Sequence, residues 1–361
     1  MKMNTENRTM LNEMETEKNY ATVLLLLSIT EKSTKAGSPY VEFLFSDGET
    51  NIRARMFNCS VEDHLFNDLS CDSLVDVALY VENFKGKKSY TVKSIYPASS
   101  CSYNVEDFAR KAPIDIERTF SELMDILSEF GDGESENRSI SRLTIDMLTY
   151  YKDQFMRSSA GKTIHHNYLG GLLQHSFAMV NCAMKICEVY PNLDKELLVC
   201  GAALHDIGKI YEMATSAVGT AEYTEKGRML GHSALGIMMV DYFNAVGFYN
   251  EERVLLLEHM IAAHHGHTEY GAIKEAAIPE AVVLHAIDMM DSRIFTFEDT
   301  LRDVEPGELT EQVFGLYNNT AYKALGKNET SSLSEDDNPL DRVANNVPLE
   351  DLFKGKDLYY V

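Results

Sequence analysis

The stretch Gly201-Ala-Ala-Leu-His205-Asp206-Ile-Gly208-Lys209 places a histidine beside an aspartate at the end of an apolar run. Residues 197–204 are mostly Leu, Val and Ala, which predicts a buried helix. Gly208 and Lys209 are typical of the end of such a helix. Because histidine offers a nitrogen ligand and aspartate offers two oxygens, the stretch predicts metal ligands at the end of a rigid element, with a cation just beyond them.

Length and composition limit the class of protein. A chain of 361 residues with 45% apolar residues predicts two or three domains with hydrophobic cores. It has no run of 18 apolar residues, and residues 1–18 lack the apolar centre of a secretion signal, so neither a membrane span nor secretion is expected. The six cysteines are scattered and form no C-x-x-C motif, which favours reduced thiols in a cytoplasmic protein.

The formal net charge of −23 argues against binding of nucleic acid over a broad surface. The charge is unevenly distributed, because residues 18–98 carry nine basic and ten acidic side chains, whereas residues 296–361 carry six basic and fourteen acidic ones. A local basic groove therefore remains compatible with the composition.

The N-terminal part of the chain has the pattern of a β-barrel. Residues 1–17 are expected to form a disordered or loosely docked arm. Alternation of apolar and polar residues predicts five strands, with a short helix at 61–69 between the third and the fourth; the strands are 21–29, 40–45, 52–57, 74–81 and 90–96. This order is that of the OB-fold barrel, a fold that binds oligonucleotides, and we assign residues 18–98 to it.

Several barrel residues are candidates for contacts with a nucleic acid strand. The loop at 35–40 and the turn with Lys85, Lys87 and Lys88 could flank the strand, and the rings of Tyr40, Phe57 and Tyr90 could stack on its bases. The alternative interpretation is that the rings belong to the barrel core and that the lysines lie on a solvated turn.

The rest of the chain is expected to be helical up to residue 295. Residues 99–160 form a helical connector with helices at 114–130 and 140–156. Residues 161–295 are expected to form an all-helical domain with helices at 167–189, 197–206, 231–242, 251–264 and 279–294. The acidic extension at 296–361 shows little periodicity, which predicts partial disorder or an extended arm over the domain or a neighbouring subunit, so a homo-oligomer is left open.

Candidate metal ligands recur once per predicted helix. They are His175, His205, Asp206, His232, His264, His265 and Asp288. The gaps of 30, 26, 32 and 23 residues each equal about one helix and its connection, so the helices of a bundle could aim these groups at one centre. Seven groups exceed the need of one ion, which favours two ions bridged by Asp206. Imidazole with carboxylate suits manganese, our first candidate, or iron, cobalt, nickel or zinc better than magnesium.

The order of these residues resembles that of the metal-dependent HD phosphohydrolase superfamily, whose members form a helical bundle. Together with the barrel, it is similar to the YhaM-type 3′–5′ exoribonucleases. The matching stretches are Lys162-Thr-Ile-His165-His166-Asn-Tyr-Leu-Gly170-Gly171-Leu-Leu-Gln-His175, Leu204-His-Asp-Ile-Gly-Lys209, Gly231-His232, His264-His265-Gly266 and Leu284-His-Ala-Ile-Asp288-Met-Met-Asp291. The resemblance covers residues 18–295 and leaves the C-terminal extension unexplained.

The resemblance implies a role for each matched residue. His175, His205, Asp206 and Asp288 would hold the first ion, and Asp206, His232, His264 and His265 the second. Asp206 and Lys209 would be catalytic, with Lys209 meeting a phosphate oxygen or the leaving group. His166 and Lys162 would contact phosphate, or else pack at a helix entry. Asp291 and Arg293 would form a surface ion pair, or else line the phosphate path. Three further histidines that match no motif position, His259, His267 and His285, are interpreted as structural.

Three functions are weighed. The first is a metal-dependent 3′–5′ exonuclease that acts on single-stranded RNA, with DNA as a second substrate, by means of a metal-activated hydroxide. The second is a hydrolase of a small nucleotide, such as a cyclic dinucleotide or a dNTP, which the acidic composition favours. The third is a non-catalytic nucleic-acid-binding factor, against which stands the competent residue at every ligand position.

Overall fold

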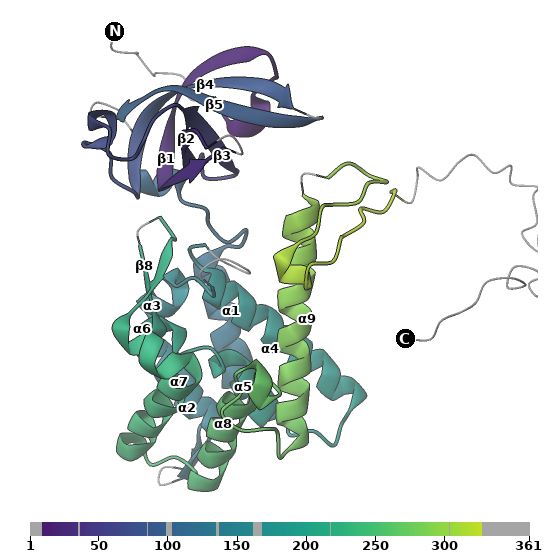
Figure 1. Ribbon diagram of the computed structural model, residues 1–361. Coiled ribbons are helices and arrows are strands. Elements are labelled where there is room, and N and C mark those ends of the chain that lie inside the picture. The colour runs from purple at the N-terminus through teal and green to yellow at the C-terminus, as the bar shows by residue number, and fades with distance from the viewer. Residues whose placement is uncertain are drawn as a thin grey trace, which may run out of the picture. The chain divides into compact units, whose positions relative to one another are not determined.

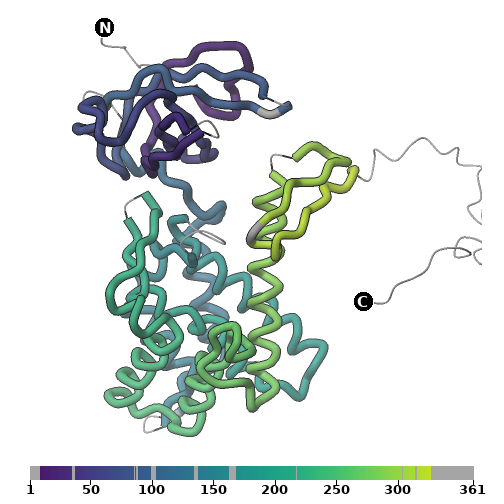
Figure 2. The backbone as a smooth tube through the Cα atoms, viewed as in Figure 1, coloured from purple at the N-terminus to yellow at the C-terminus, as the bar shows by residue number. Residues whose placement is uncertain are grey.

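The computed structural model describes residues 9–34, 37–84, 86–98, 103–134, 137–161, 168–216, 218–302 and 304–326 (Figure 1). The chain divides into two compact units, Met1–Thr296 and Phe297–Val361. Figure 2 follows the backbone from the barrel strands, in purple and blue, into the helices, in teal and green. Within the described ranges, no helix is both long and apolar enough to cross a membrane.

Five strands form a closed barrel in the order β1-β2-β3-β5-β4. They are β1 (Lys18–Ser33), β2 (Pro39–Ser46), β3 (Asn51–Phe57), β4 (Ser73–Phe84) and β5 (Lys87–Pro97). The strand β1 pairs with β4 along its first half and with β2 along its second, and a bulge between Leu26 and Ser28 interrupts its pairing with β2. Neighbouring strands are antiparallel except β3 and β5. The predicted OB-fold is thereby confirmed, although the helix expected at 61–69 is only a single 3-10 turn, His64–Phe66.

The first described residues belong to the barrel core. A 3-10 turn, Leu11–Glu13, leads into β1, and Leu11 and Met14 are 1% and 0% exposed. The Leu11 amide donates a hydrogen bond to Asp47 Oδ2 over 2.7 Å. The expectation of a disordered or loosely docked arm is therefore wrong for residues 9–17, because two apolar side chains fill the barrel. Residues 1–8 lie outside the described ranges.

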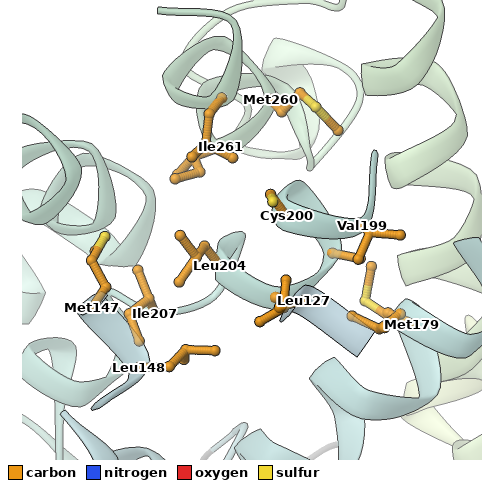
Figure 3. Close-up of a cluster of buried hydrophobic side chains, with 14 of the residues drawn as sticks. Leu127, Met147, Leu148, Met179, Val199, Cys200, Leu204, Ile207, Met260 and Ile261 are labelled. Atoms are coloured by element: carbon orange, nitrogen blue, oxygen red, sulfur yellow. The ribbon is translucent and has the colours of Figure 1, made fainter. Parts of the chain in front are cut away.

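Helices from α1 onward pack around one hydrophobic core, part of which Figure 3 shows. Leu127, Met147, Val199, Leu204 and Ile261 meet there, so the helices before and after residue 161 share the core. The helices are α1 (Ile116–Ser128), α2 (Ile140–Tyr150), α3 (Lys152–Arg157), α4 (Gly171–Val189), α5 (Lys195–Leu204), α6 (Lys209–Glu212), α7 (Glu225–Gly247), α8 (Glu251–Ala263) and α9 (Pro279–Leu301), with 3-10 turns Val105–Phe108, Thr268–Tyr270 and Phe314–Leu316.

This region departs from the predicted all-helical pattern at several points. Two short antiparallel hairpins interrupt it: β6 (Gly133–Glu134) with β7 (Asn137–Arg138), and β8 (Met213–Thr215) with β9 (Ala221–Tyr223). The helix predicted at 140–156 breaks at Tyr151, whose φ of −96° and ψ of 15° are not helical. Strands of two or three residues are too short to show alternation, which explains why the sequence did not reveal them.

The described part of the C-terminal extension has regular structure. The helix α9 continues to Leu301, and isolated bridges join Leu309 to Tyr322 and Val313 to Asn319. Ala321 is only 1% exposed. Residues 304–326 thus form local structure, whereas the sequence predicted partial disorder or an extended arm for the extension as a whole. Residues 327–361 lie outside the described part, and the prediction stays untested there.

Candidate metal centre

All the predicted metal ligands converge on one place in the helical region. His175 lies in α4, His205 and Asp206 directly follow α5, His232 lies in α7, His264 and His265 follow α8, and Asp288 lies in α9. Neighbouring rings in the series His175, His205, His264, His232 and His265 have centroids 5.1, 5.3, 5.4 and 5.0 Å apart. Five separate helices therefore deliver their polar residues to a common centre.

The ligand atoms fall into two groups, each compact enough to hold one ion. His175, His205 and Asp288 form the first half of the centre, and His232, His264 and His265 form the second half. In the first half, His175 Nε2 lies 3.2 Å from His205 Nε2 and 3.3 Å from Asp288 Oδ1. In the second half, His232 Nε2 lies 3.3 Å from His264 Nε2.

Asp206 lies between the two halves and turns one oxygen to each. Its Oδ2 is 3.3 Å from His205 Nε2 and 3.7 Å from His175 Nε2. Its Oδ1 is 3.4 Å from His232 Nε2 and 3.9 Å from His264 Nε2. This is the arrangement expected of a carboxylate that bridges two ions.

The donor set fits divalent ions. The Nδ1 atoms of His205 and His264 donate hydrogen bonds to the carbonyls of Ala202 and Ile261, over 3.1 and 2.7 Å. In a neutral ring this leaves a lone pair on Nε2, directed at the centre. In the second half, His232 Nε2 faces His264 Nε2 over 3.3 Å; where both nitrogens carry lone pairs, the two repel, and a cation between them removes the repulsion.

The charges around the centre favour bound cations. Burial opposes the charged form of Asp206, yet the Lys209 ammonium and the His205 ring hold the pKa of this carboxyl well below its usual range. Burial also opposes ionisation of Asp288, but its hydrogen bond with His175 lowers the pKa of Asp288. Burial holds the pKa of His264 well below the usual value, so its imidazole is neutral and ready to bind a metal.

His175 is the exception among the histidines. Burial alone would lower its pKa, but its hydrogen bonds with Asp288 and Asp291 raise the pKa to about 9. The ring therefore holds a proton at neutral pH when no metal is bound, and a metal ion replaces that proton.

Lys209, expected to meet a phosphate oxygen, is only 8% exposed. Its Nζ donates to Asp206 Oδ2 over 2.7 Å and to the Ala160 carbonyl over 2.5 Å. The ammonium therefore contacts the ligand carboxylate itself. Any contact between Lys209 and the substrate remains a prediction.

Two carboxylates that sequence analysis did not place in the centre contact ligand histidines. Each lies at the Nδ1 atom of its ring, on the side away from the centre. Asp291 Oδ2 lies 2.7 Å from His175 Nδ1, and Glu212 Oε1 lies 3.0 Å from His232 Nδ1. Asp291 follows the ligand Asp288 by three residues on α9, which is the one signal that could have found it. Glu212 has no such relation to a ligand in sequence.

Three other histidines of this region, all in its described part, have structural partners. His285 Nδ1 donates to the His264 carbonyl over 2.8 Å, and the Ala277 amide donates to His259 Nε2 over 2.9 Å. His267 is exposed and lies 3.3 Å from Glu275. Arg293 is an exposed residue of α9. Lys162 and His166 fall outside the described residues.

On the barrel, two of the predicted stacking residues form a pair. Tyr40 of β2 lies opposite Phe57 of β3, with ring centroids 5.7 Å apart, and Phe57 is 48% exposed. The guanidinium of Arg55 lies 6.0 Å from the centre of the Tyr40 ring. This outer face of β2 and β3 thus presents aromatic surface beside a cation.

The remaining barrel candidates are less favourably placed. Tyr90 is half-buried and packs against the barrel core, as the alternative interpretation expects. Lys88 Nζ donates to the Asn12 carbonyl over 3.3 Å. Lys85 lies outside the described residues, and Lys87 is described by its backbone alone.

Comparison with known proteins identifies the relatives of the chain. A model of the HD domain matches residues 172–293. The chain is 32% identical over 303 residues to 3′–5′ exoribonuclease YhaM of Bacillus subtilis (strain 168), a match that covers 83% of this chain and 93% of that protein. It is also 32% identical over 305 residues to 3′–5′ exoribonuclease YhaM of Bacillus licheniformis, with 84% of this chain and 94% of that protein covered.

Solved structures are similar to parts of this chain. The mitochondrial single-stranded DNA binding protein Rim1 of S. cerevisiae matches with 18% identity and a TM-score of 0.20, covering 23% of this chain and 98% of that one. The second OB-fold domain of replication protein A from Methanococcus maripaludis matches with 14% identity and a TM-score of 0.21, covering 27% and 100%. The sequence matches, which extend over barrel and helices together, establish that the chain belongs to the HD-domain family of 3′–5′ exoribonuclease YhaM.

Proposed function

We propose that the protein is a metal-dependent 3′–5′ exoribonuclease that hydrolyses phosphodiester bonds of single-stranded RNA. The observation that carries the proposal is the position of Asp206, whose two oxygens face two separate groups of histidines. The relatives named 3′–5′ exoribonuclease YhaM match over 83% of this chain, which includes the HD domain at 172–293.

The chain's own residues prepare the centre for a phosphodiester. His175, His205, Asp206 and Asp288 would hold one ion, and Asp206, His232, His264 and His265 the other. When bound, two divalent transition ions, with manganese as the first candidate, would activate water at neutral pH and balance the charge that develops on the phosphoryl group. Lys209 keeps Asp206 ionised and oriented through its 2.7 Å contact with Oδ2.

The barrel supplies the surface that retains the strand. Tyr40 and Phe57 can stack on bases, and the exposed Arg53 and Arg55 beside them can pair with phosphates. Neither contact reads sequence, which suits an enzyme that shortens RNA of any sequence. We place the activity in the cytoplasm because the cysteines that the structure describes are free thiols.

A second candidate function, hydrolysis of a small nucleotide, is favoured by the net charge of −23. A small substrate needs only a local positive site, whereas a long polyanion is repelled by the surface at large. The two functions differ in whether activity rises with the length of the substrate.

The test uses the full chain with Mn²⁺ and one RNA labelled at either end. A 5′ label is expected to appear in a ladder of progressively shorter RNAs, and a 3′ label to appear at once in mononucleotides. A cyclic dinucleotide and a dNTP are assayed in parallel. Faster turnover of either small nucleotide than of RNA would favour the second candidate, and no shortening of RNA by the metal-loaded protein would contradict the first.

A further inference from the structure

The two halves of the centre share a pattern in the contacts behind the ligand histidines. In each half, one histidine donates its Nδ1 proton to a carbonyl of the helix that carries it: His205 to Ala202, and His264 to Ile261. A second histidine of each half turns its Nδ1 to a carboxylate from a different helix: His175 to Asp291, and His232 to Glu212. Each half therefore contains one ring held by main chain and one ring held by a charged side chain.

We propose that Glu212 is a positioning residue that sets the metal affinity of the second half of the centre, and that Asp291 does the same for the first half. This inference rests on the proposed metal centre. It adds that each ion has a separate carboxylate, which contacts Nδ1 of one of the histidines that would bind the ion. The affinities of the two halves for their ions can therefore change independently.

Glu212 fixes His232 through both its ring and its backbone. Its Oε1 and Oε2 lie 3.0 and 3.1 Å from His232 Nδ1, and Oε1 also accepts a hydrogen bond from the His232 amide over 3.0 Å. The Glu212 side chain is 10% exposed and that of His232 is 14% exposed, so water competes little for either contact.

The His232 amide is available because α7 is interrupted directly before it. Gly231 has a φ of 73° and a ψ of 159°, which glycine adopts without strain. The helical hydrogen-bond pattern is interrupted there, and His232 stands at the start of the second part of the helix. The Glu212 carboxylate accepts the amide proton as a capping side chain does, and its negative charge suits the positive end of the helix dipole.

Two glycines, Gly208 and Gly227, allow α6, which carries Glu212, to pack close against α7 because they have no side chain. A Cβ on Gly227 would lie 2.1 Å from the Glu212 carbonyl oxygen, and a Cβ on Gly208 would lie 2.0 Å from the His232 carbonyl oxygen. The Glu212 carbonyl also accepts a hydrogen bond from the Thr224 amide over 2.9 Å. Both the backbone and the side chain of Glu212 are thus fixed relative to the ligand that it supports.

A carboxylate behind a metal-binding imidazole has two effects. It fixes the orientation of the ring, and it makes the opposite nitrogen a better donor to the metal, so that its loss typically weakens metal binding about 10- to 100-fold. Because Asp291 supports the other half, loss of Glu212 should weaken the binding of one ion and leave the binding of the other ion unchanged. A residue that merely held α6 against α7 would lower stability without this selectivity.

The experiment is a titration of the metal-free full chain with Mn²⁺, by calorimetry and by equilibrium dialysis, for the wild type and for Glu212→Ala, Glu212→Gln, Asp291→Ala and Asp291→Asn. The wild type should bind two ions. Glu212→Ala should lower the affinity for one ion about 10- to 100-fold and change the affinity for the other ion less than about twofold. Glu212→Gln, which keeps an acceptor but loses the charge, should lie between. Each Asp291 variant is the matched control for the Glu212 variant of the same kind.

A His264→Ala variant, in which the second half already lacks a ligand, shows which half each substitution affects. Glu212→Ala and Asp291→Ala are each combined with it. There, Glu212→Ala should leave the affinity of the remaining ion unchanged, whereas Asp291→Ala should weaken it. Wild-type affinity for both ions in Glu212→Ala and Glu212→Gln, or equal weakening of both, would overturn the inference and leave the metal centre intact. A wild type that binds no Mn²⁺ would instead overturn the proposed function. If Glu212→Ala does not fold, the comparison of Glu212→Gln with Asp291→Asn decides.

Discussion

Asp206 is the residue on which both halves of the centre depend. It is 3% exposed, and its two oxygens face histidines that come from four helices or their ends. Lys209 compensates part of the cost of burying its charge through a contact of 2.7 Å. No other ligand in the described part of the chain has atoms directed at both halves.

Asp206→Asn should therefore weaken the binding of both ions, since an amide cannot offer two anionic oxygens. We expect the metal affinity and the rate of RNA hydrolysis each to fall by at least about 100-fold. Loss of a metal ligand should lower the affinity at least as much as loss of a carboxylate that supports a ligand histidine. Asp125→Asn, at an exposed position of α1, is the control. Metal content after gel filtration and the rate of RNA shortening measure the effect, and a variant that retains two ions would contradict the bridging role.

Tyr40 and Phe57 allow a second test at the residue scale. Stacking of a base on an aromatic ring contributes about 1–3 kcal/mol, so Tyr40→Ala or Phe57→Ala should weaken binding of single-stranded RNA about 5- to 150-fold. Fluorescence anisotropy of a labelled oligonucleotide with metal-free protein measures binding without cleavage. Tyr96→Ala removes another ring of the barrel surface, 56% exposed, and should have little effect. Equal effects of all three substitutions would argue against the β2–β3 face.

The ligands could be predicted from sequence because histidine and aspartate reveal metal chemistry by residue type and spacing. Glu212 and Asp291 could not, because their role depends on the direction in which a side chain turns. Glu212 is one of 56 acidic residues, and only the folded chain shows that its carboxylate reaches His232.

At the scale of elements, the approach of α6 to α7 determines where His232 lies. Gly208 has a φ of −62° and a ψ of −17°, an ordinary helical conformation. Glycine is required there by the 2.0 Å that would separate a Cβ from the His232 carbonyl oxygen. The expectation that Gly208 and Lys209 end the helix is wrong, because α5 ends at Leu204 and the pair begins α6.

Gly208→Ala should push α6 away from α7 and lower the free energy of unfolding by about 1–3 kcal/mol or more. Gly201→Ala is the matched control in α5, because its Cβ would come too close only to the flexible end of Met260 and would lie at an ordinary 3.6 Å from Leu284. Alanine also stabilises a helix interior by roughly 1 kcal/mol relative to glycine, which offsets that contact. Urea unfolding of both metal-free variants measures the difference. A Gly208→Ala protein as stable as Gly201→Ala would contradict the close approach.

Long periodic elements were predictable, and short or interrupted ones were not. The alternation of Val41, Phe43 and Phe45 predicted β2, and those side chains are all buried. The break at Tyr151 has no such pattern, whereas α7 begins at Glu225 with a local cap, Thr224, whose hydroxyl accepts a hydrogen bond from the Gly227 amide. The kink at Gly231 shows why the sequence pattern placed the helix start there.

At the scale of the whole molecule, a strongly acidic chain must bind RNA through a limited basic surface. On the outer face of β2 and β3, Glu42 is 8% exposed and accepts hydrogen bonds from Lys32 over 2.6 Å and Arg55 over 3.3 Å. The charge of Arg53 also helps to lower the pKa of Glu42 against the effect of burial. The carboxylate thus gathers cations around the Tyr40 ring.

This limited surface predicts a weak salt dependence of RNA binding. If Lys32, Arg53 and Arg55 each neutralise one phosphate, the logarithm of the affinity should fall against the logarithm of salt concentration with a slope of about −2. Arg53→Ala with Arg55→Ala should reduce the slope to about −0.7. Anisotropy titrations of metal-free protein in increasing KCl measure it. A slope unchanged by the double substitution would place the phosphate contacts elsewhere.

The order of the parts, a barrel followed by helices, was predictable because the period of the apolar pattern changes between them. The chain ends were not. Leu11 and Met14 complete the barrel core although they lie outside its strands, and residues 304–326 form bridges without a periodic pattern. Side chains that fill a gap left by other elements leave no local signal in the sequence.

The most direct test of the account is a crystal of the full chain grown with Mn²⁺ and measured at the manganese absorption edge. Two anomalous peaks are expected, one beside His175, His205 and Asp288 and one beside His232, His264 and His265, with Asp206 reaching both. A single peak, peaks elsewhere on the chain, or none would contradict the two-ion centre from which the nuclease function is argued.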